Sequence, residues 1–521
     1  MRAGESLLEI SKSLLIHVDG CPWVWANSKR TRGQVGKEEQ KALISSKPYH
    51  ETFQYLLKDP FLPPNLDNPF PKLIVTLEDN HTFTINRYYF DKGETMEKKD
   101  YRPMWKDLGL NLEAHDQLLA ILGKAYKDIY MPQENRPKGM QYLDFVISEA
   151  HGLRIEELME TKKKGNKVVG TFCVYVPEEL ILAVGGTCVG LCAGAEIGID
   201  EAEKVLPRNT CALIKSFMGF KLAGLCPYIQ ASDLVVGETT CDGKKKAYEI
   251  LNDYKETYVM EIPQMKTERD RTLWRGEIIQ FKEKVEQLTG KKVTAENLKE
   301  GIKIANDKRR ALQRLSGLRK ATPSPISGLD ALLVNQIAFY DDPLRFTKSI
   351  NDLCDELEDR IKKGIGVTKN GTPRILVSGS PMALPNWKIL FIIETSGAVV
   401  VAEESCVGER STRDLVDETG KTIEQMIDAI VDRYFKIDCA CFTPNEERPN
   451  HVLELAKEFK VNGVIHYSIQ FCTPYTMEAY KVEKALQQKG IPILKIESDY
   501  GIEDIGQLKT RIEAFLEMVR G

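Results

Sequence analysis

The chain has 521 residues, of which 42% are hydrophobic and 28% are charged, and its formal net charge is −4. This length supports a substantial core and two to four domains, and the slightly acidic balance excludes the overall basic field typical of nucleic-acid-binding proteins. No apolar run reaches the ~20 residues of a membrane-spanning helix, and the first residues lack the pattern of a signal peptide, so we expect a cytoplasmic protein that does not bind membranes.

Residues 1–165 are expected to form a mixed region. A β-hairpin is predicted between Pro71 and Phe90, with its turn near Asp79 and Asn80. The stretches "NLEAHDQLLAILGKAYKDIY" and "QYLDFVISEAHGLRIEELMETKKKG" follow with apolar residues at helical spacing. The charged junction "KKKGNK" marks the end of this region, whose role the sequence leaves open.

The pattern changes at residue 166. "KVVGTFCVYV" predicts a buried strand, and "PEELILAVGG" predicts a helix with proline in its first turn and glycine at its end. Further strands are predicted at "LVVG" and "TYVMEIP". This alternation is typical of a parallel sheet, which we assign to a first α/β domain over 166–263.

Residues 264–369 are helical and charged, and we interpret them as an insertion packed on the domains rather than a binding device. Strand-like runs then return at "PRILVSGS", "AVVVAEES", "VNGVIHYSIQF" and "IPILKIESD", and an amphipathic helix ends the chain. The prediction is an α/β fold with two Rossmann-like parallel-sheet domains, 166–263 and 370–521, a helical insertion and a mixed N-terminal region.

Twelve cysteines require an explanation in a chain expected to lie in a reducing compartment. Some will be buried apolar side chains, which is the usual role of a free cysteine. No CxxC spacing occurs, so zinc-ribbon and ferredoxin-type sites are not indicated. Any metal site must therefore be assembled from distant segments.

A strand followed by a cysteine and then a helix occurs three times, at Cys241, Cys406 and Cys472. Each cysteine is expected just past the carboxyl end of a parallel strand, the edge at which open α/β sheets bind ligands. One such cysteine is consistent with simple packing. Three at equivalent places, divided between two domains, favour a shared site.

Other thiols lie close by in sequence. Cys211 follows the possible helix caps Asn209 and Thr210, which would favour its thiolate form, and Cys226 precedes a proline. Two sets of three are thus possible: Cys211, Cys226 and Cys241, and Cys406 and Cys472 with either Cys439 or Cys441.

The remaining cysteines are assigned less directly. Cys173, within a predicted strand, and Cys354, within a predicted helix, are interpreted as packing residues, and the roles of Cys188 and Cys192 stay open. All-sulfur coordination suits zinc, Cu(I) or iron–sulfur clusters. Two sets facing one cleft favour a cluster at the domain interface, because structural zinc sites more often use tight local spacing.

Polar residues near these cysteines are candidates for proton transfer to a reduced substrate. They are Glu238, Glu403, Glu404 and His466, although structural roles are open for each. The basic residues after the cysteines, Lys244, Lys245, Lys246, Arg410 and Arg413, suit either an anionic cluster, an acidic partner or a solvated helix face. The loop "GSPMALPNW" after a strand is a candidate substrate wall.

Neither GxGxxG nor GxxxxGK[ST] occurs, so no dinucleotide or P-loop site is indicated, and any ATP would be bound by another protein.

Several motifs resemble the 2-hydroxyacyl-CoA dehydratase and benzoyl-CoA reductase family. They are "VYVPEELILAVGG", "DLVVGETTCDGKKKAYE", "EESCVGER" and the stretch that begins "VNGVIHYSIQFCTPYTMEAYKVEKAL", and they cover residues 166–521 in the expected order. Within that family the chain is most similar to the double-cubane cluster proteins, because of Cys226 and the segment "DCACFTPNEER".

This resemblance implies an [8Fe–9S] cluster of two [4Fe–4S] cubanes joined by a sulfide. Its implied ligands are Cys211, Cys226 and Cys241 for one cubane and Cys406, Cys439 and Cys472 for the other, with Cys441 as the alternative to Cys439. It further implies electrons from a separate ATP-hydrolysing [4Fe–4S] activator, a homodimer, and reduction of small molecules of the acetylene, hydrazine or azide type.

Two other interpretations remain. One is a 2-hydroxyacyl-CoA dehydratase or benzoyl-CoA reductase subunit with a single [4Fe–4S] cluster. The other, from a different class, is a non-catalytic electron carrier or metal-storage protein. Six candidate cluster cysteines in one chain favour the double cubane over the single-cluster subunit. The expected buried cleft, the polar residues near the cysteines and the family resemblance argue against the non-catalytic protein, while the natural substrate is not implied.

Overall fold

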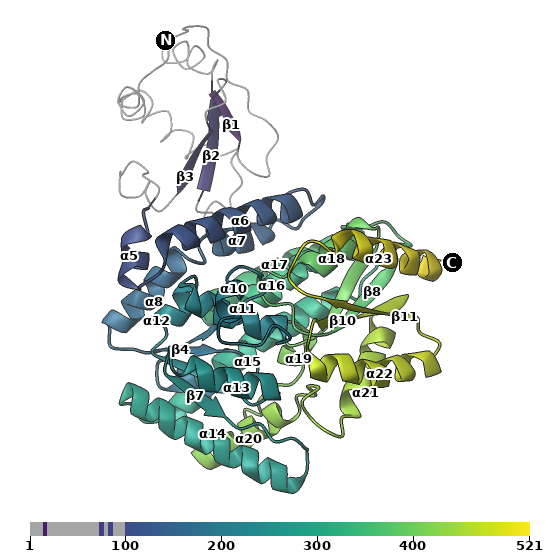
Figure 1. Cartoon of the computed structure of the whole chain (residues 1–521). Helices are drawn as coiled ribbons and strands as arrows, with labels where there is room; N and C mark the ends of the chain where they lie inside the picture. Colours follow the sequence, from purple (N-terminus) through teal and green to yellow (C-terminus); the bar gives the residue numbers. More distant parts are fainter. Residues whose placement is uncertain (1–13, 18–71, 78–81, 87–98, 521) are drawn as a thin grey trace, which may run out of the picture. The chain divides into compact units, whose positions relative to one another are not determined.

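The computed structural model describes residues 14–17, 72–77, 82–86 and 99–520 (Figure 1). The chain divides into two compact units, residues 1–100 and 101–521. In the first unit, β1 (Leu14–His17), β2 (Lys72–Leu77) and β3 (Thr82–Asn86) form an antiparallel sheet in that order. The predicted hairpin is thus confirmed in its two strands, and its turn lies outside the described residues.

The second unit contains two four-stranded sheets, and every strand pair in them is parallel. The first sheet has the order β5-β4-β6-β7, and the second has the order β11-β10-β8-β9. The strands of the first are β4 (Val168–Thr171), β5 (Thr187–Gly190), β6 (Leu234–Glu238) and β7 (Thr257–Met260). Those of the second are β8 (Arg374–Gly379), β9 (Val399–Glu404), β10 (Gly463–Ile469) and β11 (Ile493–Ser498).

Both faces of each sheet are covered by helices, as the continuous apolar strands require. On β8, Val377 packs with one cluster that includes α18 (Lys388–Thr395) and α23 (Ile505–Arg520). Its neighbour Leu376 packs with a second cluster that includes α21 (Glu447–Glu458) and α22 (Thr473–Gln488). On β6, Val235 and Val236 divide in the same way between two clusters. Successive side chains of a strand point to opposite faces, so these runs are apolar at every position.

Helices of the second unit precede the first sheet, connect the strands of both sheets, form the segment between the sheets and end the chain. Four long or central helices make up that segment: α14 (Glu268–Thr289), α15 (Ala295–Leu318), α16 (Gly328–Ile337) and α17 (Pro343–Lys362). The others are α5 (Arg102–Asp107), α6 (Leu112–Tyr130), α7 (Met140–Ser148), α8 (Leu153–Lys163), α9 (Glu178–Ala183), α10 (Ile199–Ala202), α11 (Ala212–Leu222), α12 (Pro227–Ala231), α13 (Asp242–Leu251), α18 (Lys388–Thr395), α19 (Glu409–Thr412), α20 (Ile423–Phe435), α21 (Glu447–Glu458), α22 (Thr473–Gln488) and α23 (Ile505–Arg520).

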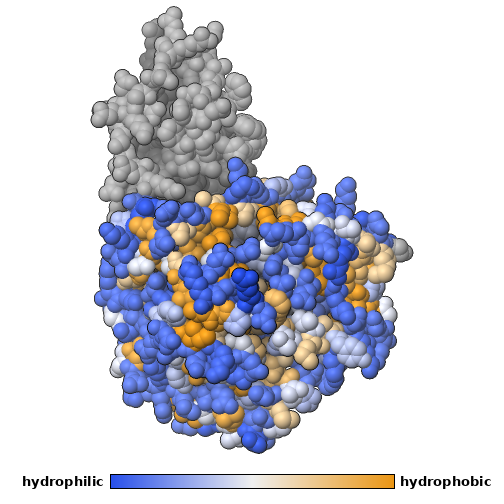
Figure 2. Space-filling model, viewed as in Figure 1, coloured by the Kyte–Doolittle hydropathy of each residue, from blue (hydrophilic) through white to orange (hydrophobic). Residues whose placement is uncertain are grey.

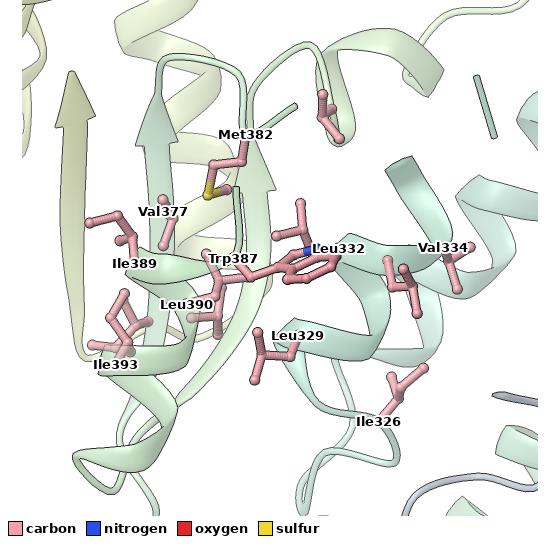
Figure 3. Packing of buried hydrophobic residues seen from close by; sticks show 14 of the residues in the cluster. Ile326, Leu329, Leu332, Val334, Val377, Met382, Trp387, Ile389, Leu390 and Ile393 are labelled. Carbon is pink, nitrogen blue, oxygen red and sulfur yellow. The ribbon is translucent and has the colours of Figure 1, made fainter. Parts of the chain in front are cut away.

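The largest core cluster joins the second sheet to the helical segment. Figure 3 shows Trp387, just before α18, with its ring directed toward the helix that carries Leu332. The indole Nε1 donates to Gln336 Oε1 at 2.8 Å, so the polar edge of this buried ring is satisfied. Packing across this cluster therefore fixes α16 against the sheet.

The α/β fold with two parallel sheets is confirmed, and the sheets lie inside the ranges 166–263 and 370–521. The domain boundaries themselves stay a prediction. One strand is not predicted from the sequence, because the spacing of Cys188 and Cys192 in "GGTCVGLCAG" suits a helical or loop face, whereas Thr187–Gly190 is the edge strand β5. Among the described residues, no helix is both long and apolar enough to cross a membrane. Figure 2 shows that the visible face is largely hydrophilic, with separate hydrophobic patches.

Candidate functional site: a cavity lined by thiols

Eight cysteine side chains surround one cavity of about 110 Å³ between the two sheets. Four come from the side of the first sheet, and four from the side of the second. They are Cys173, Cys192, Cys211 and Cys241, and Cys406, Cys439, Cys441 and Cys472. Histidine, aspartate and glutamate are absent from the described residues that line this cavity. The available donor set is therefore sulfur, which suits an iron–sulfur cluster.

The strand ends position these thiols as expected. Cys241 lies three residues past β6 and is the N-cap of α13, where its sulfur accepts a hydrogen bond from the Lys244 backbone N at 3.4 Å. Cys472 holds the corresponding place between β10 and α22, and Cys406 follows β9. Two separate parallel sheets thus direct their carboxyl ends to one cavity, where ligands of α/β proteins bind.

Two thiol pairs join the halves of the cavity. A hydrogen bond with Cys173 lowers the pKa of the Cys406 thiol to about 7. A hydrogen bond with Cys472, helped by the backbone N–H groups of Leu213 and Ile214, lowers the pKa of Cys211. Cys173 and Cys211 follow strands of the first sheet, Cys406 and Cys472 follow strands of the second, and all four line the cavity, so the two cysteine sets converge there.

A third pair lies within one loop. This pair is Cys439 and Cys441. A hydrogen bond with Cys441 lowers the pKa of Cys439 to about 5. The hydrogen bond with Cys439 and burial raise the pKa of Cys441 well above its usual range. Both residues line the cavity, so the choice between them stays open.

Two polar side chains contact the sulfurs from the second sheet. Arg410 Nη1 lies 3.4 Å from Cys406 Sγ, and the Tyr475 hydroxyl lies 3.4 Å from Cys439 Sγ. The Arg410 guanidinium also donates to the Tyr475 hydroxyl and pairs with Glu404. These contacts favour the thiolate form of both cysteines.

Lys244 supplies a second buried cation and lines the cavity. Burial opposes its charge, but Tyr248, Cys173, Cys192 and Glu238 raise its pKa well above the ordinary value. Lys246 is exposed by contrast, so only part of the basic run faces solvent. Lys244 and Arg410 are therefore the two cations of the predicted basic set that lie at the thiols.

The four candidate proton-transfer residues are buried, but none is among the residues that line the cavity. Glu238 contacts a residue that lines the cavity, since its Oε1 accepts from the Cys173 backbone N at 3.2 Å. Its Oε2 has no hydrogen-bond partner among the described residues, and burial raises its pKa to about 7. Glu238 thus has the free carboxyl oxygen that a proton donor needs.

The other three candidates are held in structural contacts. Glu403 forms a two-bond ion pair with Arg319, and Glu404 pairs with Arg410 and Arg448. Burial lowers the pKa of His466 to about 4, and its Nε2 lies 3.2 Å from the Tyr475 carbonyl oxygen. A neutral buried histidine in β10 and two paired carboxylates favour roles in packing.

Glu404, Asp438 and His451 place three ligand-type atoms within 4.8 Å of one another. The carboxylates already pair with arginines, Glu404 with Arg410 and Asp438 with Arg413 at 2.7 Å. This cluster is therefore an ion-pair network behind the thiol cavity.

Three described cysteines, Cys188, Cys226 and Cys354, are not among the residues that line the thiol cavity. Cys226 is buried at the start of α12, where its sulfur accepts from the Ile229 backbone N at 3.4 Å, and it is not among the residues that line the cavity. Cys188 contacts Thr171, and Cys354 packs inside α17 as expected. Cys173, interpreted as a packing residue, instead lies past the end of β4 and lines the cavity. The predicted substrate wall contributes Pro381, Ala383 and Leu384.

Comparisons with known proteins agree with this geometry. The family model described as 2-hydroxyglutaryl-CoA dehydratase, D-component, matches residues 173–519. A protein of Escherichia coli (strain K12) named as a dehydratase subunit, YjiM, is 38% identical over 379 residues, which cover 72% of this chain and 97% of that protein.

Two further relatives are more distant. The (R)-phenyllactyl-CoA dehydratase beta subunit of Clostridium sporogenes is 25% identical, with 68% of this chain and 92% of the relative covered. A benzoyl-CoA reductase component of Thauera aromatica is 21% identical, with 66% and 87% covered. The chain therefore belongs to the 2-hydroxyacyl-CoA dehydratase and benzoyl-CoA reductase family, as its motifs indicated.

Proposed function

We propose that this protein is a low-potential iron–sulfur reductase that carries a double-cubane [8Fe–9S] cluster in the thiol cavity. The observation that carries the proposal is the convergence of eight thiols from both sheets on one cavity. A single [4Fe–4S] cluster on three or four cysteines would leave about half of these thiols without a metal. The number of thiols therefore favours the larger cluster.

The proposed ligands include five residues of the set that the resemblance implied, Cys211, Cys241, Cys406, Cys439 and Cys472, all of which line the cavity. For the sixth, the resemblance gives Cys226, whereas the cavity favours Cys173, which lines it while Cys226 does not. We propose Cys173 for this position and keep Cys226 as the alternative. Cys441 remains the alternative to Cys439.

When bound, the cluster would supply low-potential electrons to a small substrate. The chain's own residues create the environment for that chemistry. Arg410 and Lys244 compensate negative charge on the sulfurs, and the loop with Pro381 and Leu384 supplies an apolar wall that limits access of water. Glu238, beside the Cys173 backbone, is the proposed proton donor, while Glu403, Glu404 and His466 remain weaker candidates.

Electrons are proposed to come from a separate ATP-hydrolysing [4Fe–4S] activator, in agreement with the lack of a P-loop sequence. Small substrates of the acetylene, hydrazine or azide type remain part of the proposal, as do a homodimer and a cytoplasmic location. The relatives named as dehydratase subunits favour one alternative, a 2-hydroxyacyl-CoA dehydratase-like or benzoyl-CoA reductase-like subunit with a single [4Fe–4S] cluster.

Iron and acid-labile sulfide analysis of anaerobically purified protein separates these candidates. The proposal predicts about eight irons per chain, and the alternative predicts about four. Replacing Cys241 by serine should roughly halve the iron content and abolish turnover with a reduced activator, because one cubane loses a thiolate. A count of about four irons in the unaltered protein would contradict the double cubane.

The matched control is Cys354→Ala. Cys354 is fully buried in α17, away from the cavity, so this variant should keep the complete iron content. Loss of iron from this variant as well would show that iron retention reports on folding rather than on ligation.

A further inference from the structure

A second cavity, of about 220 Å³, lies beside the thiol cavity and shares part of its wall. Thr171, Cys173, Val174, Gly190 and Phe339 line both cavities. The other walls include residues of α9, α15, α16, α17, α19 and α20, so the cavity lies between the first sheet, the helical segment and helices that follow β9. Unlike the thiol cavity, it is lined by several charged side chains.

Among these charged side chains, Arg433 differs from the other cations because it has no carboxylate partner in the described part of the chain. It lies in α20 with only 3% of its surface exposed, and no carboxylate of the described residues lies within ion-pair distance of it. Its Nε donates to the Asp414 carbonyl oxygen at 3.1 Å and its Nη2 donates to the Ser411 carbonyl oxygen, while Nη1 has no partner in the described part of the chain. Burial and the neighbouring Arg309 lower its pKa. Because Nη1 is not among the fully buried atoms that lack a partner, it is accessible, and Arg433 can bind an anion in the cavity that it lines.

The other charges of this cavity already have partners. Lys308 pairs with Glu178, and Arg309 Nη1 lies 2.6 Å from Glu179 Oε1. On the opposite side, Asp341 pairs with Arg345. The last acid, Asp342, caps α17 by accepting from the backbone N–H groups of residues 344 and 345. The carboxylates that line the cavity are thus engaged elsewhere, and Arg433 is left without one.

A neutral polar group completes the polar side. The Asn335 side chain lines the same cavity, is 9% exposed, and its amide has no hydrogen-bond partner within the described ranges. Neither side chain is among the described residues with fully buried, unpartnered polar atoms, so the Asn335 amide and the Arg433 Nη1 group are accessible and can bind a polar ligand.

The rest of the lining is apolar, with Leu182, Ile304, Leu312 and Phe339 among its members. A ligand that fits both sides has one anionic group for Arg433 and a short apolar chain. A carboxylate matches the planar guanidinium, which can bind its two oxygens at once.

We propose that this second cavity binds a short-chain carboxylate, with its anionic group at Arg433 and its hydrocarbon chain against the wall shared with the thiol cavity. Arg433 supplies the charge and Asn335 supplies a hydrogen bond, while Phe339 contacts the chain. The site depends on these residues and not on a cluster, so it goes beyond the proposed reductase function. Its position next to Cys173 places such a ligand beside the thiols.

Isothermal titration calorimetry of the purified holoprotein with butyrate tests this site. We expect butyrate to bind, and its neutral isostere butyramide to bind at least tenfold more weakly, because only the anion compensates Arg433. Arg433→Gln should weaken butyrate binding by tenfold or more, while Arg433→Lys should keep part of it. Equal binding of the two compounds, or no binding of butyrate, would overturn the proposal.

Two further variants keep the test decisive. Asn335→Asp changes only the charge at that position and should also weaken butyrate binding by tenfold or more, even if Arg433→Gln does not fold. Arg511→Gln, an exposed arginine of α23, should bind butyrate as the unaltered protein does. Unchanged binding in Asn335→Asp or Arg433→Gln would contradict the assignment.

Failure of this inference can be told from failure of the proposed function. A Cys406→Ser variant should lose iron and still bind butyrate, because Cys406 does not line the second cavity. A protein with about eight irons that binds no butyrate would reject the carboxylate site alone, whereas butyrate binding to a protein with about four irons would reject the double cubane alone.

Discussion

At the scale of single residues, buried arginines determine the electrostatics behind the thiol cavity. Arg410 and Arg448 are both fully buried and share Glu404, and Arg410 reaches Cys406. A buried ion pair is maintained only when its members keep their partners. The contacts to sulfur are therefore held in fixed positions by a network that extends away from the cavity.

Tyr475 provides a test of these contacts. Its hydroxyl oxygen accepts from Arg410, so its hydrogen is free to donate to Cys439 Sγ at 3.4 Å. Hydrogen bonds to cluster sulfurs raise the reduction potential. Tyr475→Phe should therefore lower the midpoint potential in an EPR-monitored redox titration while the iron content stays unchanged.

The control for this variant is Tyr480→Phe, which removes a hydroxyl from an exposed position on the same helix, α22. The two variants should differ in midpoint potential. Identical potentials in Tyr475→Phe and in the unaltered protein would show that this hydroxyl does not act on the cluster.

Arg319 provides a test of the buried charges. It pairs with Glu403 through two bonds of 2.7 and 2.6 Å, and both residues are almost fully buried. Arg319→Met leaves a buried carboxylate without its partner, so the free energy of unfolding should fall by about 3–5 kcal/mol. Chemical denaturation followed by circular dichroism measures this change.

The neighbouring residue gives the matched comparison. Lys320 forms an exposed ion pair with Glu458, and such pairs contribute at most about 1 kcal/mol. Lys320→Met should therefore leave the free energy of unfolding almost unchanged. If both variants lost the same stability, burial would not be the cause.

At the scale of elements, strands with continuous apolar runs were predictable from sequence, and contacts between distant elements were not. The segments around Cys241, Cys406 and Cys472 predicted the strand-cysteine-helix unit because both strand and helix signals are local. The run "KVVGTFCVYV" predicted one buried strand, but the observed strand is shorter, because pairing of β4 with both neighbours ends at Thr171 and Cys173 lies beyond it. Apolar sequence continues there, but the sheet does not.

Arginines from distant elements explain why the predicted proton donors Glu403 and Glu404 lie in ion pairs instead. Glu403 and Glu404 lie at the end of a strand, as proton donors at a ligand-binding edge would, but Arg319 and Arg448 neutralise them from the end of α15 and from α21. Strand order and ion pairing depend on such long-range contacts, and neither leaves a periodic pattern in the sequence.

Helix α6 offers a test at this scale. His115 of α6 and His151 in the loop before α8 lie with Nε2 and Nδ1 3.0 Å apart, and burial lowers their pKa values to about 4 and about 3. The unfolded chain binds protons on both below about pH 6.5, whereas the folded chain does not. The free energy of unfolding should therefore fall as pH drops from about 6.5 to about 4, by up to about 3 kcal/mol per histidine.

His115→Gln removes one of these titrating groups, so its unfolding free energy should change less steeply with pH over that interval. Both proteins should show no contribution from this pair at about pH 8, where the histidines are neutral in either state. Parallel profiles for the two proteins between about pH 4 and 6.5 would contradict the assignment.

At the scale of the whole molecule, two parallel sheets point their carboxyl ends at one cavity, and the helical segment forms part of its wall. The segment contributes Gln336, Phe339 and Tyr340 to the thiol cavity, so it is part of the site rather than a connection alone. The family was predictable from motifs because these lie at the strand ends. The second cavity was not, since its charges come from separate elements of the fold.

The most direct test of the account is the location of iron by anomalous diffraction at the iron absorption edge, on crystals of anaerobically purified protein. The account predicts iron positions inside the thiol cavity, at about 2.3 Å from cysteine sulfurs of both sheets, Cys241 and Cys406 among them. The same map decides between Cys173 and Cys226 for the sixth ligand. Iron bound by cysteines of one sheet alone, or outside this cavity, would contradict the account.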